Sequence, residues 1–139
     1  MKTIGLDLGS VTCGIAVSDS LGWIAQALTT VRFEKDDYDD ALEKVINVCK
    51  QQKVTNLVLG LPKHMNGDIG VRGNICLEFQ KKLQERGYQV TMWDERLTTV
   101  AAQKILIGAD VSRKKRKKVI DQMAAVQILQ NYLDAKSFR

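Results

Sequence analysis

The chain has 139 residues, 45% of them hydrophobic, and a formal net charge of +5. This length suits one domain with one core, so we expect residues 1–139 to form a single domain without room for a second. No apolar run approaches the roughly eighteen residues of a membrane span, and the N-terminus reads as a strand rather than a signal sequence, so we expect a cytoplasmic protein with no membrane segment.

The positive charge is concentrated in one run near the C-terminus. Residues 113–118 hold six of the 21 basic residues, which leaves 15 against 16 acidic residues in the rest of the chain. The run consists of Arg113, Lys114, Lys115, Arg116, Lys117 and Lys118. Such a cluster attracts polyanions and favours a phosphate backbone as partner. The alternative is an ordinary solvated run of charges.

Cysteine and histidine usage argues against a zinc site. Cys13, Cys49 and Cys76 are far apart in apolar stretches, so we expect reduced packing residues. The single histidine, His64, has no cysteine or histidine at ligand spacing and is expected to be a polar loop residue.

The first part of the chain predicts three strands joined by short turns. In Thr3–Leu8 the apolar residues alternate with Gly5 and Asp7, which places a carboxylate on the second face of the strand. Cys13–Ser18 and Ile24–Phe33 are the next two extended stretches. Three consecutive strands with short connections form an antiparallel meander.

Helices and strands alternate after Lys35. We expect a helix over Asp37–Gln52, a strand over Val54–Gly60 and a loop from Leu61 to Gly73. A helix that ends at Gly87 and a strand over Tyr88–Trp93 should follow. The last two elements are expected to be a helix from Thr98 or Thr99 to about Gly108 and a helix from about Lys117 to Ala135.

This order predicts an α/β fold with a mixed five-stranded sheet. The meander supplies three antiparallel strands, the later strands add two parallel ones, and helices flank the sheet. Trp23 and Trp93 fall in strand-like stretches and are expected to be packed, so we see little sign of a base-stacking platform.

Three carboxylates occupy positions that packing alone does not explain. Asp7 lies between glycines in the first strand, and Glu95 follows the last strand. Asp121 shares a helical face with Ala125 and Ile128. Each has an alternative: a turn cap for Asp7, a surface ion pair with Arg96 for Glu95, and the margin of an apolar stripe for Asp121.

Taken together, the three acids predict a metal site. A first strand, a last central strand and a closing helix can bring their side chains to one end of a sheet. Converging carboxylates repel each other unless a hard cation neutralises them, and oxygen ligands of this kind select Mg²⁺ or Mn²⁺. Such ions would serve hydrolysis of a phosphodiester.

Several motifs resemble the YqgF family, also called RuvX, in the right order over nearly the whole chain. They are Gly5-Leu6-Asp7-Leu8-Gly9, Gly14-Ile15-Ala16-Val17-Ser18-Asp19, Gly60-Leu61-Pro62 with Gly67, Asp94-Glu95-Arg96-Leu97-Thr98-Thr99, and Asp121 with Ala124-Ala125. The resemblance implies a ribonuclease H-like fold related to Holliday-junction resolvases and a role in maturing the 5′ end of pre-16S rRNA. It also implies that Asp7, Glu95 and Asp121 are the acidic metal-binding and catalytic residues. Thr12 departs from the family, in which many members carry a basic residue there.

Other polar residues are candidates for nucleic-acid contacts beside the basic run. Arg72 lies in a glycine-spaced stretch that could approach a backbone closely, Arg96 could reach a phosphate, and Thr98 could offer a hydroxyl. The alternatives are a connector without contacts for the stretch around Arg72 and a helix cap for Thr98.

We therefore expect a divalent-metal-dependent nuclease that acts on structured RNA, with pre-16S rRNA implied by the resemblance, as a monomer or weak homodimer. One alternative keeps the site but makes four-way DNA the substrate, in which case a two-fold dimer would cut two strands. Another is a noncatalytic RNA-binding assembly factor. A nucleotide-binding phosphotransferase needs two such domains around a cleft, and the chain is too short for that.

Overall fold

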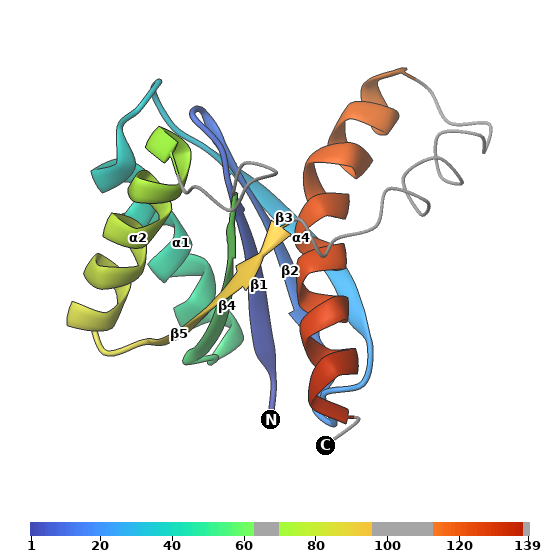
Figure 1. Ribbon diagram of the computed structural model, residues 1–139. Helices are drawn as coiled ribbons and strands as arrows, with labels where there is room; N and C mark the ends of the chain where they lie inside the picture. Colours follow the sequence, from blue (N-terminus) through green and yellow to red (C-terminus); the bar gives the residue numbers. More distant parts are fainter. Residues whose placement is uncertain (63–69, 96–112, 138–139) are drawn as a thin grey trace.

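Five strands form one mixed sheet in the order β3-β2-β1-β4-β5 (Figure 1). The computed structural model describes residues 1–62, 70–95 and 113–137, with the backbone alone for residues 113–121 and 137. The strands are β1 (Thr3–Leu8), β2 (Thr12–Ser18), β3 (Ala25–Arg32), β4 (Asn56–Leu61) and β5 (Gln89–Asp94). β1, β2 and β3 pair antiparallel, whereas β4 pairs parallel with both β1 and β5. The predicted meander with two added parallel strands is confirmed.

Helices cover both faces of this sheet. Figure 1 shows α1 (Tyr38–Gln52) and α2 (Gly70–Glu85) on one face and α4 (Arg113–Ser137) on the other. Asp37 caps α1 because its carboxylate accepts the backbone N–H of Asp40 at 3.2 Å, and Lys53 ends this helix in the left-handed conformation. No helix in the described ranges is both long and apolar enough for a bilayer.

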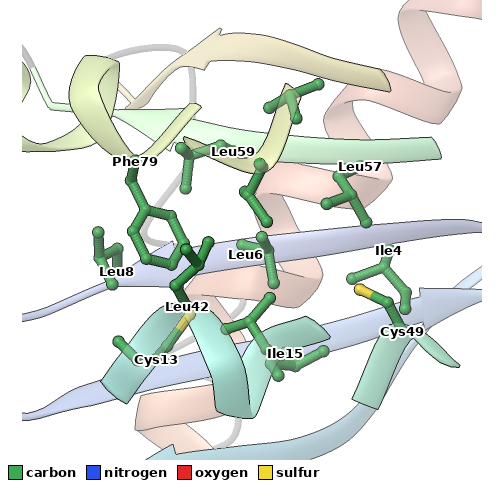
Figure 2. Close-up of a cluster of buried hydrophobic side chains, with 14 of the residues drawn as sticks. Ile4, Leu6, Leu8, Cys13, Ile15, Leu42, Cys49, Leu57, Leu59 and Phe79 are labelled. Carbon is green, nitrogen blue, oxygen red and sulfur yellow. The ribbon is translucent and has the colours of Figure 1, made fainter. Parts of the chain in front are cut away.

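The larger core lies between the sheet and the pair α1 and α2. Alternation along β1 sends Ile4, Leu6 and Leu8 to this face, where all three are buried. Figure 2 shows them beside Leu57 and Leu59 of β4, Leu42 and Cys49 of α1, and Phe79 of α2. Cys13, Cys49 and Cys76 are buried free thiols, as predicted. Each fully buried large side chain here contributes about 1.5–3 kcal/mol of transfer free energy.

The second core is smaller and holds α4 against the other face. Ala125, Ile128 and Leu129 are buried there. A side chain at Gly5 would put its Cβ 2.7 Å from Leu129 Cβ and 3.0 Å from the Ala125 carbonyl oxygen. Glycine in the first strand therefore lets the α4 backbone approach the sheet closely.

Three expectations need correction. α2 begins at Gly70, so the stretch up to Gly73 is helical although a loop was expected. The glycines there suggested a loop, whereas Gly73 is buried in the helix and makes room for packing. α4 begins at Arg113 rather than Lys117, so the basic run is helical.

The third correction concerns Trp23, which was expected to be packed but is 60% exposed, because it lies in the turn before β3. Trp93 is half-buried and meets Tyr132 edge-to-face at 6.1 Å, as expected. The helix expected from residue 98 to 108 and the loop position of His64 lie outside the described residues.

Candidate active site

Asp7 lies at the carboxyl end of β1, on the sheet face that α4 covers. Its partner in β2 is Gly14, and on the other side Gly60 follows Leu59, which pairs with Leu6. Glycines in both neighbouring strands keep side chains away from the flanks of this carboxylate. The two neighbouring strands therefore place no side chain of their own beside Asp7. This position is at the carboxyl edge of the sheet, where ligand sites of open α/β sheets lie.

Glu95 reaches the same edge of the sheet from the end of β5. It directly follows the last residue of this strand, and a Cβ at Gly60 would lie only 2.5 Å from Glu95 Oε1. The Glu95 side chain thus occupies the space that the missing side chain of Gly60 leaves. It is hydrogen-bonded to the Asp7 side chain. The structure brings together two of the three predicted acids, which lie 88 positions apart in the sequence.

The electrostatics of this pair are unfavourable for two negative charges. Burial, the Asp7 charge and the hydrogen bond to Asp7 together raise the pKa of Glu95 to about 8, while the Arg72 charge opposes them. Two carboxyl groups in contact cannot both ionise cheaply, so one proton is shared between them near neutral pH.

Arg72 braces the same edge of the sheet from α2. Its Nη2 donates to the Leu8 carbonyl oxygen at 2.7 Å, and its Nη1 donates to the Tyr38 hydroxyl oxygen at 2.8 Å. The guanidinium therefore connects α2, the end of β1 and the start of α1, within Coulombic range of Glu95. Sequence reasoning expected a nucleic-acid contact at Arg72, which stays a prediction, and it missed this internal role.

The cysteine thiols near the two carboxylates are unreactive. Burial raises the pKa of Cys76 to about 12, with the Glu95 charge as the next cause. Burial also raises the pKa of Cys13 well above its ordinary value, with Asp7 as the next cause. Both side chains are protonated at neutral pH, so they are neither nucleophiles nor thiolate ligands.

The backbone of α4 brings Asp121 toward this edge. α4 runs antiparallel to β1 (Figure 1), and the Ala125 carbonyl lies over Gly5. Asp121 lies one helical turn before Ala125, a step of about 6 Å along α4. Asp7 lies two residues after Gly5, a step of about 7 Å along β1. Because α4 and β1 are antiparallel, the two steps run in the same direction. The side chain of Asp121 lies outside the described part.

The remaining predicted contact residues fall on less described parts of the chain. Arg96 and Thr98 lie outside the described residues, and the basic run 113–118 is described by its backbone in α4. Gly60 and Tyr38 were not predicted as parts of the site. A glycine inside an otherwise apolar strand was the available signal for Gly60.

The chemistry of the described donors fits a hard divalent cation. Carboxylate oxygens are the preferred ligands of Mg²⁺ and Mn²⁺, and a cation would relieve the repulsion that raises the pKa of Glu95. Among the described side chains, no group of three or more histidine, cysteine, aspartate or glutamate residues gathers at one point.

Comparison with solved structures defines the class of fold. The resolvase RuvC of T. thermophilus, in complex with a Holliday junction, has a TM-score of 0.63 at 15% identity, with 99% of this chain and 96% of that chain covered. The fowlpox virus Holliday junction resolvase has a TM-score of 0.61 at 10% identity, with 98% and 99% covered. The chain therefore has the fold of these resolvases, and the expected ribonuclease H-like architecture is confirmed.

Sequence comparison then defines the family. Residues 1–135 match the family model described as "RuvX: Holliday junction resolvase". A protein of Staphylococcus saprophyticus named "Putative pre-16S rRNA nuclease" is 52% identical over 136 residues, 96% of each chain. One of Bacillus thuringiensis with the same name is 50% identical over 137 residues, 98% of this chain and 100% of the relative. The chain belongs to the RuvX family.

Proposed function

We propose that this protein is a divalent-metal-dependent nuclease that hydrolyses phosphodiester bonds of structured nucleic acid. The observation that carries the proposal is the hydrogen-bonded pair of Asp7 and Glu95 at the carboxyl edge of the sheet, with the pKa of Glu95 raised to about 8. A site that confines two carboxyl groups at this cost is suited to binding a cation.

Asp7, Glu95 and Asp121 would hold Mg²⁺ or Mn²⁺. Such an ion, when bound, activates water and neutralises charge on the phosphate. The chain itself orients the two carboxylates: Gly60 leaves the space in which Glu95 lies, and Arg72 fixes the Leu8 carbonyl next to Asp7. Glu95 would give up its proton as the cation enters.

The proposed substrate is the precursor of 16S rRNA, cut in processing of its 5′ end. This proposal rests on the name of the relatives that are 50% and 52% identical over nearly the whole chain. The basic run 113–118 would hold the RNA backbone near the acids, because α4 carries both the run and Asp121. We propose that the protein acts in the cytoplasm as a monomer or weak homodimer.

A second candidate is resolution of four-way DNA junctions. It is supported by the description of the family and by the fold shared with RuvC and the fowlpox virus resolvase. This reaction would require a two-fold dimer, since a resolvase cuts two strands symmetrically.

One cleavage experiment tests both candidates. Wild-type protein and Asp7→Asn are incubated with precursor RNA or junction DNA in the same buffer, with Mg²⁺, with Mn²⁺ or with EDTA. We expect cleavage that needs the metal and falls at least about 10³-fold in Asp7→Asn. Asp39→Asn, on the exposed side of α1, is the matched control and should cleave like the wild type.

The outcomes separate the hypotheses. Metal-dependent cutting of the RNA alone supports the rRNA nuclease, and cutting of the junction alone supports the resolvase. Salt-sensitive RNA binding without turnover would identify a noncatalytic assembly factor. Full activity in a clean preparation of Asp7→Asn would refute the assignment of the site.

A further inference from the structure

A cluster of apolar side chains is exposed on the turn between β2 and β3, at the end of the sheet opposite the carboxylates (Figure 1). Leu21 is 75% exposed, Trp23 60% and Ile24 58%. Met1, also largely exposed, lies beside this turn, because its backbone nitrogen donates to the Ser20 carbonyl oxygen at 2.7 Å. Large exposed side chains that gather in one place mark interaction surfaces, unlike those that are scattered singly.

The turn is held rigidly although its side chains are exposed. The Asp19 carboxylate accepts the backbone N–H of Trp23 at 2.7 Å and of Ile24 at 3.1 Å, and these bonds lower its pKa. Gly22 adopts a φ of 76°, which glycine tolerates at little cost. The local backbone is thus fixed from within.

α4 holds the same turn from outside. Gln130 Nε2 donates to the Trp23 carbonyl oxygen at 3.0 Å, and Gln130 Oε1 accepts the Ala25 N–H at 2.9 Å. A rigid display of apolar side chains loses little conformational entropy when it binds a partner. Tryptophan is also among the residues that contribute most binding energy at interfaces.

A hollow of about 220 Å³ lies beside the exposed side chains. Its lining comprises Met1, Thr3, Leu21, Gly22, Trp23, Leu133 and Lys136. The volume is sufficient for one large apolar side chain, and Lys136 is the charged side chain of the wall. The two nearby carboxylates of Asp19 and Asp134 accept hydrogen bonds from the turn and from Gln130, respectively.

We propose that this surface binds a segment of another protein that inserts a large apolar side chain into the hollow and sets a carboxylate against Lys136. Aliphatic side chains outnumber the single indole on the surface, which favours a protein over bases that would need stacking platforms. Lys136 is the one charged side chain among the described residues that line the hollow, which favours a partner segment that carries a carboxylate.

Selection from a library of random twelve-residue peptides displayed on phage tests this proposal. Peptides that bind the full chain are retained after depletion on the Trp23→Ala variant. We expect them to share a large apolar residue next to aspartate or glutamate. Their affinity, read from the Trp23 fluorescence of a Trp93→Phe variant, should fall at least tenfold in Lys136→Glu. Val71→Ser, which removes an exposed apolar side chain far away on α2, is the control and should leave it unchanged.

Four results would overturn the proposal. The first is the absence of peptides that depend on Trp23 or Lys136. The second is a loss of single-stranded RNA binding in Trp23→Ala, which would make the surface a nucleic-acid site. The third is a dimer in sedimentation that Trp23→Ala dissolves. The fourth is peptide binding only after removal of residues 138–139, which would make the end of the chain itself the occupant. If Trp23→Ala fails to fold, Leu21→Ser replaces it in the selection.

Discussion

Asp7 and Glu95 together form a pair of acids whose ionisation works against the fold. The folded-state pKa of Glu95, about 8, lies above its ordinary value of about 4.3. Between these two pH values the unfolded chain releases a proton that the folded chain keeps, so in the absence of metal stability falls as the pH rises from about 4 to about 8.

Glu95→Gln should therefore stabilise the metal-free protein at pH 8 by about 1–3 kcal/mol. This range is smaller than the full pKa shift would give, because the Glu95 side chain is partly exposed. Near pH 4 the substitution should have little effect on stability. Urea unfolding in EDTA at several pH values measures this difference. Glu43→Gln should show the opposite pH dependence, because the Arg86 hydrogen bond lowers the pKa of Glu43. The ionised Glu43 stabilises the fold at neutral pH, and this stabilisation is lost as the pH falls below about 4. A Glu95→Gln variant that is less stable than the wild type at pH 8 would contradict this prediction.

Arg72 should act on turnover more than on substrate binding. Arg72→Met removes the bonds to Leu8 and Tyr38, so we expect kcat to fall about tenfold or more and stability to drop by about 1–3 kcal/mol, with a small change in KM. Tyr38→Phe loses one of these bonds and should show a smaller effect on both. Steady-state kinetics decides the matter: a rise in KM with kcat unchanged would favour the nucleic-acid contact expected from the sequence.

Much of the site at this scale could be predicted from the sequence. Asp7 and Glu95 stand out because a carboxylate on an alternating strand and another at a strand end have no packing reason to be there. The contribution of Gly60 could not be predicted, since it depends on which side chain from a different strand fills the space. The role of Arg72 depends on where α2 begins, and the glycines around it suggested a loop.

Among the elements, α4 has the most demanding fit to the sheet. It approaches β1 over Gly5 and β4 over Gly60, where an added Cβ would lie 2.6 Å from Ile128 Cδ1. At Gly5 the added Cβ meets the helix backbone, whereas at Gly60 it meets the ends of two side chains, Glu95 and Ile128. The two glycines thus control different properties of the protein.

Gly5→Ala should cost about 1–3 kcal/mol of stability or more, because α4 has to shift as a whole. Gly60→Ala should unfold at nearly the wild-type temperature but lose most of its activity, because the Glu95 carboxylate is displaced. Thermal unfolding and a cleavage assay on both variants check this contrast. Equal loss of stability in the two variants would show that the Ile128 contact, rather than Glu95, dominates at Gly60.

The elements themselves were largely predictable, and the exceptions have physical reasons. The strands and α1 follow their hydrophobic periods, and Asp37 acts as the expected N-cap. The start of α2 was placed too late because Gly70 and Gly73 are poor helix formers that packing tolerates here. α4 was predicted too short because its first residues are charged and show no apolar stripe.

For the molecule as a whole, we propose that one basic run of the chain holds the substrate. The excess positive charge lies in residues 113–118, at the start of the helix that also carries Asp121. Phosphate contacts of this kind release counterions, so binding depends steeply on salt.

Replacing the four lysines of this run by glutamine should weaken RNA binding at all sequences and reduce the slope of log K against log salt by up to about 3–4. Binding titrations between 50 and 200 mM KCl, approximately, measure the slope. Replacing four lysines elsewhere, Lys44, Lys50, Lys53 and Lys82, is the matched control and should leave the slope nearly unchanged. An unchanged slope in the first variant would show that residues 113–118 are an ordinary solvated run of charges that does not contact the RNA.

On the proposed assignment of the site, the distribution of the acids along the chain also determines when the protein can become active during its own synthesis. Asp7 belongs to the first strand, Glu95 follows the last, and Asp121 lies in the final helix. The meander of β1, β2 and β3 has short-range contacts and can form early on the ribosome, whereas the parallel strands and α4 arrive later. A translation product that stops before α4 carries Asp7 without Asp121, so on the proposed assignment of the site we expect incomplete chains to lack nuclease activity.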